Sequence, residues 1–320
     1  MTGRGPYSPR TTRDDLRREL GQNFLQDKRV VRDLVSCVAG TGTNVLEIGP
    51  GKGAITSELI HSFETVTAVE MDPHWASYLR EKFDGRRVRI FQGDFLDFRI
   101  PGDIDTVVGN VPFGITTQIL RRLLESTQWQ SAALIVQWEV ARKRVGRSGG
   151  TLLSTSWAPW YEFDLRGRVR ATAFRPMPRV DGGILTIRRR PQPLLPERAC
   201  AAFQDFAEAV FTGPGRGLAE ILRRHVPRRT YMDLAERFHI PADGLPKDLT
   251  LRQWVVLFEA ARPQYADGGI RTASQQAQRA AGRRGGPSHG DGSGPRAPVR
   301  QTQDRQGGRR SSSGRRTGKR

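Results

Sequence analysis

The residues of this 320-residue chain best suited to chemistry are Asn110, Pro112 and Phe113, which follow an expected strand at 105–109. The side-chain oxygen of Asn110 and a neighbouring backbone carbonyl can each accept one N–H of an adenine amine. Two acceptors favour a pyramidal nitrogen whose lone pair is free to attack. Pro112 stiffens such a loop, and Phe113 offers a ring on which a base can stack. The pattern predicts methylation of an adenine amine, although Asn and Pro also favour plain turns.

A second candidate binding element is a run of three glycines at alternate positions, Gly49, Gly51 and Gly53. They lie between an apolar run at 45–48 and a predicted helix at 54–63. Strand, glycine turn and helix open an α/β sheet, in which ligands bind beyond the carboxyl ends of the strands. Glu70 ends the next strand, 66–69, where a ribose-binding acid is expected. A plain tight turn would also account for the glycines alone.

The glycine spacing matches neither a dinucleotide site nor a phosphate-binding P-loop. Lys52 is therefore expected to be a solvated loop lysine. Asp94 follows a third strand, 88–91, and could reach a purine amino group, or it could simply cap the next turn. Because parallel strands end at one sheet edge, Glu70, Asp94 and Asn110 are expected to share one site.

Hydrophobic periodicity indicates the remaining elements. Further strands are expected at 133–138 and 183–187, and helices at 28–38, 74–83, 139–145, 199–211, 218–225, 230–238 and 251–260. The expected fold class is α/β, with a small C-terminal α-helical domain. The expected boundaries are a flexible arm at 1–18, a catalytic domain at 19–190, a helical domain at 191–262 and a disordered Arg/Gly-rich tail at 263–320.

The charge indicates a polyanionic partner, since the formal net charge is +19 and the pI about 11.2. Residues 271–320 hold twelve Arg and one Lys against two Asp, so more than half of that charge lies there. This segment has too few apolar residues for a core, and either grips RNA or only solubilises the chain. Five arginines of the helical region offer a nucleic-acid face or a merely solvated one: Arg216, Arg223, Arg224, Arg228 and Arg229.

Two cysteines, Cys37 and Cys200, are too few for a metal site or a disulfide framework. No apolar stretch approaches a membrane span, and the N-terminus has no secretory signal. We expect a soluble, monomeric protein of the cytoplasm that binds neither a metal nor a membrane. The aromatic residues Trp157, Trp160 and Tyr161 are expected to pack on the sheet, or else to face RNA.

Five ordered motifs together resemble the rRNA adenine N6-methyltransferases, which include the Erm macrolide-resistance enzymes and the KsgA-type dimethylases. The motifs are Gln22–Leu25, Glu47–Gly53 with Glu70, Gly93–Asp94, Asn110–Phe113 and Phe174–Pro178. The resemblance spans residues 19–262. The segments Trp157–Phe163 and Gly213–Gly217, with the Gly/Arg-rich tail, resemble the actinobacterial Erm proteins most.

The resemblance implies a Rossmann-like class I methyltransferase sheet and the cofactor S-adenosyl-L-methionine. It implies methyl transfer to N6 of one adenine in the peptidyl-transferase region of protein-free or precursor 23S rRNA, conferring macrolide, lincosamide and streptogramin B resistance. Asn23, Leu25, Gly49 and Gly51 would bind the cofactor, with Glu70 on the ribose and Asp94 on the adenine. Asn110 would lie between cofactor and target amine, while Phe113 and Phe174 would stack on the target base.

Three other interpretations remain open at this point. A KsgA-type 16S rRNA dimethylase shares every pocket motif, although the aromatic segment and tail argue against it. A DNA adenine methyltransferase uses similar Asn-Pro chemistry but lacks the motifs at Gln22–Leu25 and Phe174–Pro178. A non-catalytic RNA-binding factor with the same fold is the third, and the intact set of Glu70, Asp94 and Asn110 speaks against it.

Overall fold

The computed structural model describes residues 23–126, 128–146, 150–261, 263 and 265. All of them belong to one compact unit, Met1–Ala273. The expected N-terminal arm at 1–18 and nearly all of the expected tail at 263–320 lie outside the described residues.

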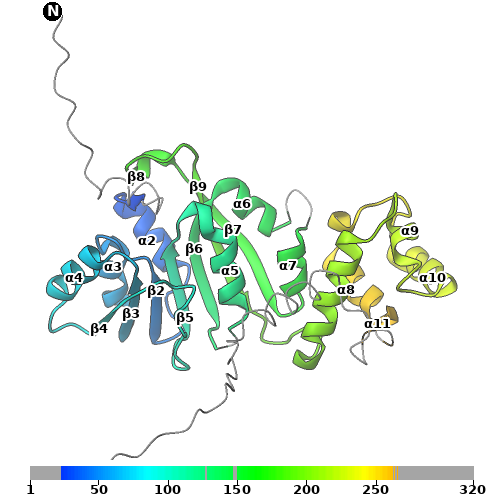
Figure 1. The fold of residues 1–320 in the computed structure, drawn as a ribbon, viewed down its shortest axis with the longest axis horizontal. Coiled ribbons are helices and arrows are strands. Elements are labelled where there is room, and N and C mark those ends of the chain that lie inside the picture. Colours follow the sequence, from blue (N-terminus) through cyan, green and yellow to red (C-terminus); the bar gives the residue numbers. More distant parts are fainter. Residues whose placement is uncertain (1–22, 127, 147–149, 262, 264, 266–320) are drawn as a thin grey trace, which may run out of the picture. The chain divides into compact units, whose positions relative to one another are not determined.

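A seven-stranded sheet forms the centre of the fold, in the order β4-β3-β2-β5-β6-β9-β7 (Figure 1). Its strands are β2 (Asn44–Ile48), β3 (Thr65–Glu70), β4 (Val88–Gln92), β5 (Thr106–Asn110), β6 (Ser131–Gln137), β7 (Tyr161–Val169) and β9 (Gly182–Arg189). The first five strands in the sheet order run parallel, and β9 is antiparallel to both β6 and β7. The predicted α/β sheet is confirmed, and β7 is an additional strand that was not predicted.

Both faces of this sheet are covered, because buried strand residues point alternately to either side. Leu46, Val107 and Leu134 join one core cluster, which includes the apolar side of α5 (Thr116–Leu124). Their neighbours Val45, Val108 and Ala133 join a second cluster with α2 and α3. The helices around the parallel strands are α2 (Lys28–Ser36), α3 (Ala54–Ser62), α4 (Pro73–Lys82), α5 and α6 (Trp138–Arg144).

A separate two-stranded sheet joins two distant sequence motifs. β1 (Phe24–Leu25) pairs antiparallel with β8 (Phe174–Arg175), with Phe24 opposite Arg175 and Leu25 opposite Phe174. The backbone of Gln26 also donates to the carbonyl of Ala173 at 2.8 Å. The N-terminal motif is thus held in place by a segment some 150 residues further along the chain.

The C-terminal part of the described chain is helical, as predicted. Its helices are α8 (Cys200–Thr212), α9 (Leu218–Leu222), α10 (Arg228–Phe238) and α11 (Leu251–Ala261), and α7 (Leu152–Trp157) packs on α8. The change from strand to helix falls between Arg189 and Cys200. A domain boundary at residue 190 stays a prediction.

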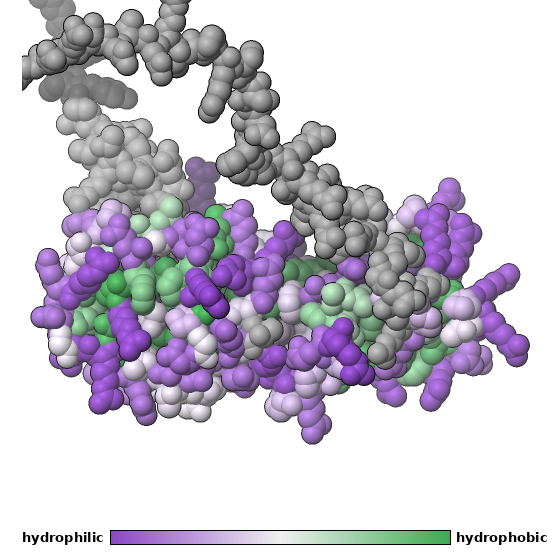
Figure 2. All heavy atoms as spheres, turned by 60° about the horizontal axis from the view of Figure 1, so that its bottom comes forward, coloured by the Kyte–Doolittle hydropathy of each residue, from purple (hydrophilic) through white to green (hydrophobic). Residues whose placement is uncertain are grey.

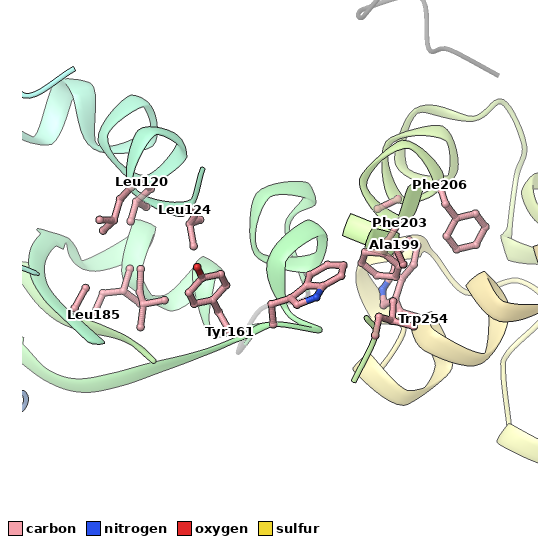
Figure 3. Packing of buried hydrophobic residues seen from close by; sticks show 14 of the residues in the cluster. Leu120, Leu124, Tyr161, Leu185, Ala199, Phe203, Phe206 and Trp254 are labelled. Atoms are coloured by element: carbon pink, nitrogen blue, oxygen red, sulfur yellow. The ribbon is translucent and has the colours of Figure 1, made fainter. Parts of the chain in front are cut away.

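Aromatic side chains connect the sheet core to these helices. Tyr161 stacks on Trp129 at 5.1 Å between ring centroids, and Trp160 meets Phe203 of α8 edge to face at 5.8 Å. Figure 3 shows Tyr161 on the sheet side and Phe203 among the helices. Trp160 and Tyr161 are almost completely buried, which confirms the packing interpretation for these two residues.

Hydrophilic side chains cover most of the face in Figure 2, and apolar residues show in patches between them. The five arginines of the helical region are all exposed. Within the described residues, no helix combines the length and the apolar character needed to span a bilayer.

Candidate functional site

A cavity with a volume of about 310 Å³ lies at the carboxyl ends of β2, β3, β4 and β5. This is the edge at which open α/β sheets bind ligands. The cavity brings together nine of the ten predicted site residues: Asn23, Leu25, Gly49, Gly51, Glu70, Asp94, Asn110, Pro112 and Phe113. The tenth, Phe174, does not line it.

The glycine turn forms one wall of the cavity through its backbone. Gly49 and Gly51 have φ values of 66° and 54°, which side-chain-bearing residues rarely adopt. A Cβ atom on Gly51 would lie 2.9 Å from two ring carbons of Phe24. The turn therefore needs glycine at 51 for both its conformation and its contact with β1.

Glu70 is tied to the glycine turn by hydrogen bonds. One carboxylate oxygen accepts the backbone N–H of Gly51 at 2.8 Å, and the other accepts that of Asp72 at 2.9 Å. Burial raises the pKa of Glu70, while these two N–H groups oppose the rise. Each oxygen keeps a further lone pair that could accept a hydroxyl group from a ligand.

Asp94 lies at the end of β4 with one oxygen engaged and one available. Its Oδ1 accepts the backbone N–H of Leu96 at 2.9 Å, which fixes the side chain as in a turn cap. Its Oδ2 has no hydrogen-bond partner in the described part of the chain. The cap interpretation and the ligand interpretation are thus compatible, because each uses a different oxygen.

Asn110 has an orientation set by its hydrogen bond. Its Nδ2 donates to the backbone carbonyl of Asn23 at 2.7 Å. Since a carbonyl can only accept, the amide nitrogen must face Asn23, the residue before β1, and the side-chain oxygen is directed elsewhere. Asn110 lines the cavity, and its side-chain oxygen is not used by this bond. Its predicted role as an acceptor for the target amine stays a prediction.

The loop after Asn110 is short and braced. Val111 N–H donates to the Ile135 carbonyl of the neighbouring strand at 3.2 Å. Thr116 Oγ1 donates to the carbonyls of Pro112 and Phe113, each at 3.2 Å. Phe113 is only partly buried and lines the cavity, so one side of its ring remains available for stacking.

Phe174 differs from the expectation. Its side chain is fully buried in the cluster of α2 and α3, because β8 pairs with β1 and turns the ring inward. It meets Phe113 edge to face at 6.4 Å between centroids. In this arrangement Phe174 supports the Phe113 ring from behind and presents no surface to an incoming base.

Two further cavity residues, Phe24 and Lys52, make contacts that the sequence did not predict. Phe24 lines the cavity between Asn23 and Leu25, and packs against Trp75 of α4 at 5.3 Å. Lys52 Nζ lies 4.9 Å from the centre of the Phe24 ring and 5.6 Å from that of Trp75. Lys52 is exposed, as expected, but it is a stacked cation over β1 and not a free loop lysine. Of these two residues, only Phe24 could have been anticipated, because it lies inside the motif Gln22–Leu25.

The arrangement suits S-adenosylmethionine. A cavity of this size is within the range of small-molecule sites, and its lining is mainly apolar with a few fixed polar groups. Glu70 offers acceptors for ribose hydroxyls, Asp94 one for an amino group, and the glycine turn allows close backbone approach. The residues present therefore fit this cofactor.

Comparison with known proteins agrees with this geometry. The family described as ribosomal RNA adenine dimethylase matches residues 13–262. The mycinamicin-resistance protein MyrB of Micromonospora griseorubida is 45% identical over 248 residues, which are 77% of this chain and 79% of that protein. An rRNA adenine N-6-methyltransferase of Corynebacterium diphtheriae is 44% identical over 208 residues, 65% of this chain and 82% of that protein.

The crystal structure of the 23S rRNA methyltransferase ErmE superposes with a TM-score of 0.70 at 33% identity, covering 75% of this chain and all of that one. The family match spans more than two thirds of the sequence and includes every cavity residue named above. This chain belongs to the ribosomal RNA adenine dimethylase family.

Proposed function

We propose that this protein is an S-adenosylmethionine-dependent methyltransferase that modifies N6 of one adenine in the peptidyl-transferase region of 23S rRNA. The modified base would obstruct macrolide, lincosamide and streptogramin B antibiotics. The similarity to a mycinamicin-resistance protein and to a 23S rRNA methyltransferase supports this choice of RNA over 16S rRNA. The substrate would be protein-free or precursor large-subunit RNA, and the enzyme a monomer.

One observation supports the chemistry most directly: the hydrogen bond from Asn110 to the Asn23 carbonyl. It leaves the Asn110 side-chain oxygen as an acceptor beside Pro112 and Phe113. An adenine amine held by that oxygen and a loop carbonyl would keep its lone pair out of the ring. Nucleophilic attack requires that lone pair.

The cofactor would be held by the residues that line the rest of the cavity. Glu70 would accept hydrogen bonds from ribose hydroxyls, and Asp94 Oδ2 one from the adenine amino group. Asn23 and Leu25 of β1 would close over the cofactor, and Gly49 and Gly51 would lie under it. S-adenosylmethionine supplies a methyl group already activated by its sulfonium, so the protein's task is alignment of the two reactants.

The target adenine must leave its stack to reach Asn110. Phe113 is the residue proposed to stack on it, and the buried Phe174 ring would fix the position of Phe113. The exposed arginines of α10 and of the turns on either side of α9 would contact phosphates of the RNA. The basic tail, outside the described residues, would add further phosphate contacts.

The direct test is radiolabelled methyl transfer from S-adenosylmethionine to protein-free large- and small-subunit rRNA, followed by mapping of the modified nucleotide. The proposal expects label on a single adenine of the peptidyl-transferase region. Label confined to 16S rRNA would instead identify a KsgA-type dimethylase. No label on either RNA would leave a DNA substrate or a binding-only role.

A further inference from the structure

Arg144, at the end of α6, has an unusual charge environment. Its guanidinium is half-buried between three helices, and it donates to Thr151 Oγ1 at 2.9 Å and to Thr117 Oγ1 at 3.2 Å. Thr117 is in the first turn of α5, and Thr151 is the N-cap of α7. Both partners are neutral hydroxyls, so the positive charge of Arg144 is held in place without being neutralised.

No carboxylate compensates this charge in the described part of the chain. The hydrogen bonds use two of the five N–H groups of a guanidinium, and the buried Nε has no partner. The pKa of Arg144 is lowered first by burial and then by the positive charge of Arg121 on α5. Residues 147–149, which lie outside the described part of the chain, are Arg, Ser and Gly in the sequence and include no acidic residue.

A third positive feature lies at the same place. Thr117 is the second residue of α5, a nine-residue helix whose N-cap, Ile115, makes no side-chain capping bond. The amino-terminal end of a helix carries partial positive charge and unsatisfied N–H groups. A half-buried cation, a second arginine and a helix start without a carboxylate form an arrangement that an anion would stabilise.

The location of Arg144 favours an anion of the nucleic acid over one of the cofactor. Neither Arg144 nor its partners Thr117 and Thr151 line the cofactor cavity. Phe113 does line it, and α5 follows directly after the 3₁₀ turn Phe113–Ile115. Thr117 is the fourth residue after Phe113, which corresponds to a rise of roughly 6 to 8 Å along a helix. Figure 1 shows α6 beyond the end of β6 and above α5.

From these observations we propose that Arg144, positioned by Thr117 and Thr151 and assisted by Arg121, binds a backbone phosphate of the strand that carries the target adenine. A guanidinium matches phosphate oxygens with paired N–H donors, and such charge-assisted bonds are strong. The contact would anchor the strand beside Phe113 while the base is turned out of its stack. This inference rests on the proposed RNA substrate, but it concerns binding and can be measured apart from methylation.

The test is the salt dependence of RNA binding by the full-length protein, with a transcript of the peptidyl-transferase region of 23S rRNA as probe. Arg144→Gln should weaken binding about tenfold and make the slope of log K against log salt shallower by about 0.7 to 0.9, the value for one lost phosphate contact. Cofactor affinity, measured by calorimetry without RNA, should stay unchanged. An unchanged salt slope in Arg144→Gln would overturn the phosphate contact.

Arg86→Gln is the matched control, because it removes the same charge from an exposed loop before β4, at the opposite edge of the sheet. Arg86→Gln should bind the RNA probe as the unchanged protein does. An equal decrease of the salt slope in this variant would mean that Arg144 acts only through the net charge of the protein, which would contradict the proposal. If Arg144→Gln unfolds at a lower temperature than the unchanged protein, the variant Arg144→Lys is the decisive one. It should keep the salt slope and bind the RNA probe more weakly. Full RNA affinity in Arg144→Lys would contradict a contact made by paired N–H donors.

The two proposals can fail separately. Methylation of 23S rRNA by the unchanged protein, together with an unaltered slope for Arg144→Gln, would refute the phosphate contact alone. Absence of methylation, together with a shallower slope for Arg144→Gln, would refute the proposed target and leave supported only a phosphate contact of Arg144 with the RNA probe.

Discussion

The stability of the cofactor-free protein should depend on pH through Glu47, a carboxyl group of β2 with no exposed surface. Its Oε2 accepts the Thr56 hydroxyl at 2.6 Å, and its Oε1 has no partner. Burial, with a smaller contribution from the nearby charge of Glu70, raises the pKa of Glu47 from 4.5 to about 8. The folded protein therefore holds this proton more tightly than the unfolded chain.

The sign follows from proton linkage. Below pH 4.5 Glu47 is neutral in both the folded and the unfolded state, so it does not lower the free energy of unfolding. As the pH rises from 4.5 towards 8, the unfolded chain releases the proton and the folded protein does not, so stability falls. Each unit of pKa difference is worth about 1.4 kcal/mol, which gives about 5 kcal/mol once the pH is above 8 and about 2 kcal/mol between pH 6 and 8.

The variant Glu47→Gln isolates this effect, because a neutral amide of the same size keeps the acceptor for Thr56. Thermal unfolding of both proteins at pH 6 and pH 8 is the assay. The advantage of Glu47→Gln in unfolding free energy should grow by about 2 kcal/mol over this interval, or about 4 to 8 °C in melting temperature. Other titrating groups are shared by both proteins and largely cancel in the difference. A difference that does not change with pH would refute the buried neutral carboxyl.

Three further predictions concern the site and the tail. Asn110→Ala should lower the turnover number by a hundredfold or more while cofactor affinity falls far less, since the lost oxygen acts on the amine; equal losses in kinetics and calorimetry would move Asn110 to cofactor binding. Gly51→Ala should weaken cofactor binding about tenfold, because its Cβ would displace Phe24, whereas Gly85→Ala, with φ of 68° and open space around it, should leave binding unchanged in the same titration. Deletion of residues 271–320 should weaken RNA binding and flatten its salt dependence with the melting temperature retained, and an unaltered slope would mean that the tail makes no phosphate contact.

Most of the sheet was predictable because its strands are short apolar runs that end at special residues. The apolar runs that lead to Gly49, Glu70, Asp94 and Asn110 all form parallel strands. Their carboxyl ends lie at the sheet edge that carries the cavity, so the position of the cavity could be predicted as well. β7 was not predicted, although Tyr161–Val169 alternates buried and exposed residues along most of its length. The sequence of this strand alternates apolar and polar residues from Tyr161 to Val169, and a period of two is the usual sign of a strand with one buried face.

The packing of individual rings was beyond the sequence. Phe174 lies in the proline-rich segment Phe174–Pro178, and nothing in its sequence neighbours indicates whether the ring faces the cavity or the core. Its burial follows from pairing with Leu25, a contact between segments 149 residues apart. The stacking of Lys52 on Phe24 depends on the same placement of β1. Two-residue strands have no periodicity, so sequence patterns could not reveal them.

The placement of β1 also explains why position 110 suits an asparagine. The side chain there must donate to the Asn23 carbonyl and still offer an acceptor to the cavity. An ionised aspartate has only acceptors and would face that carbonyl with no proton to share, while alanine offers neither group. The hydrogen bond from Nδ2 of Asn110 thus also fixes the orientation of its side-chain oxygen. β8 pairs with β1, which directly follows Asn23. Under the proposed mechanism, the motif around Phe174 would therefore act through the backbone of Asn23.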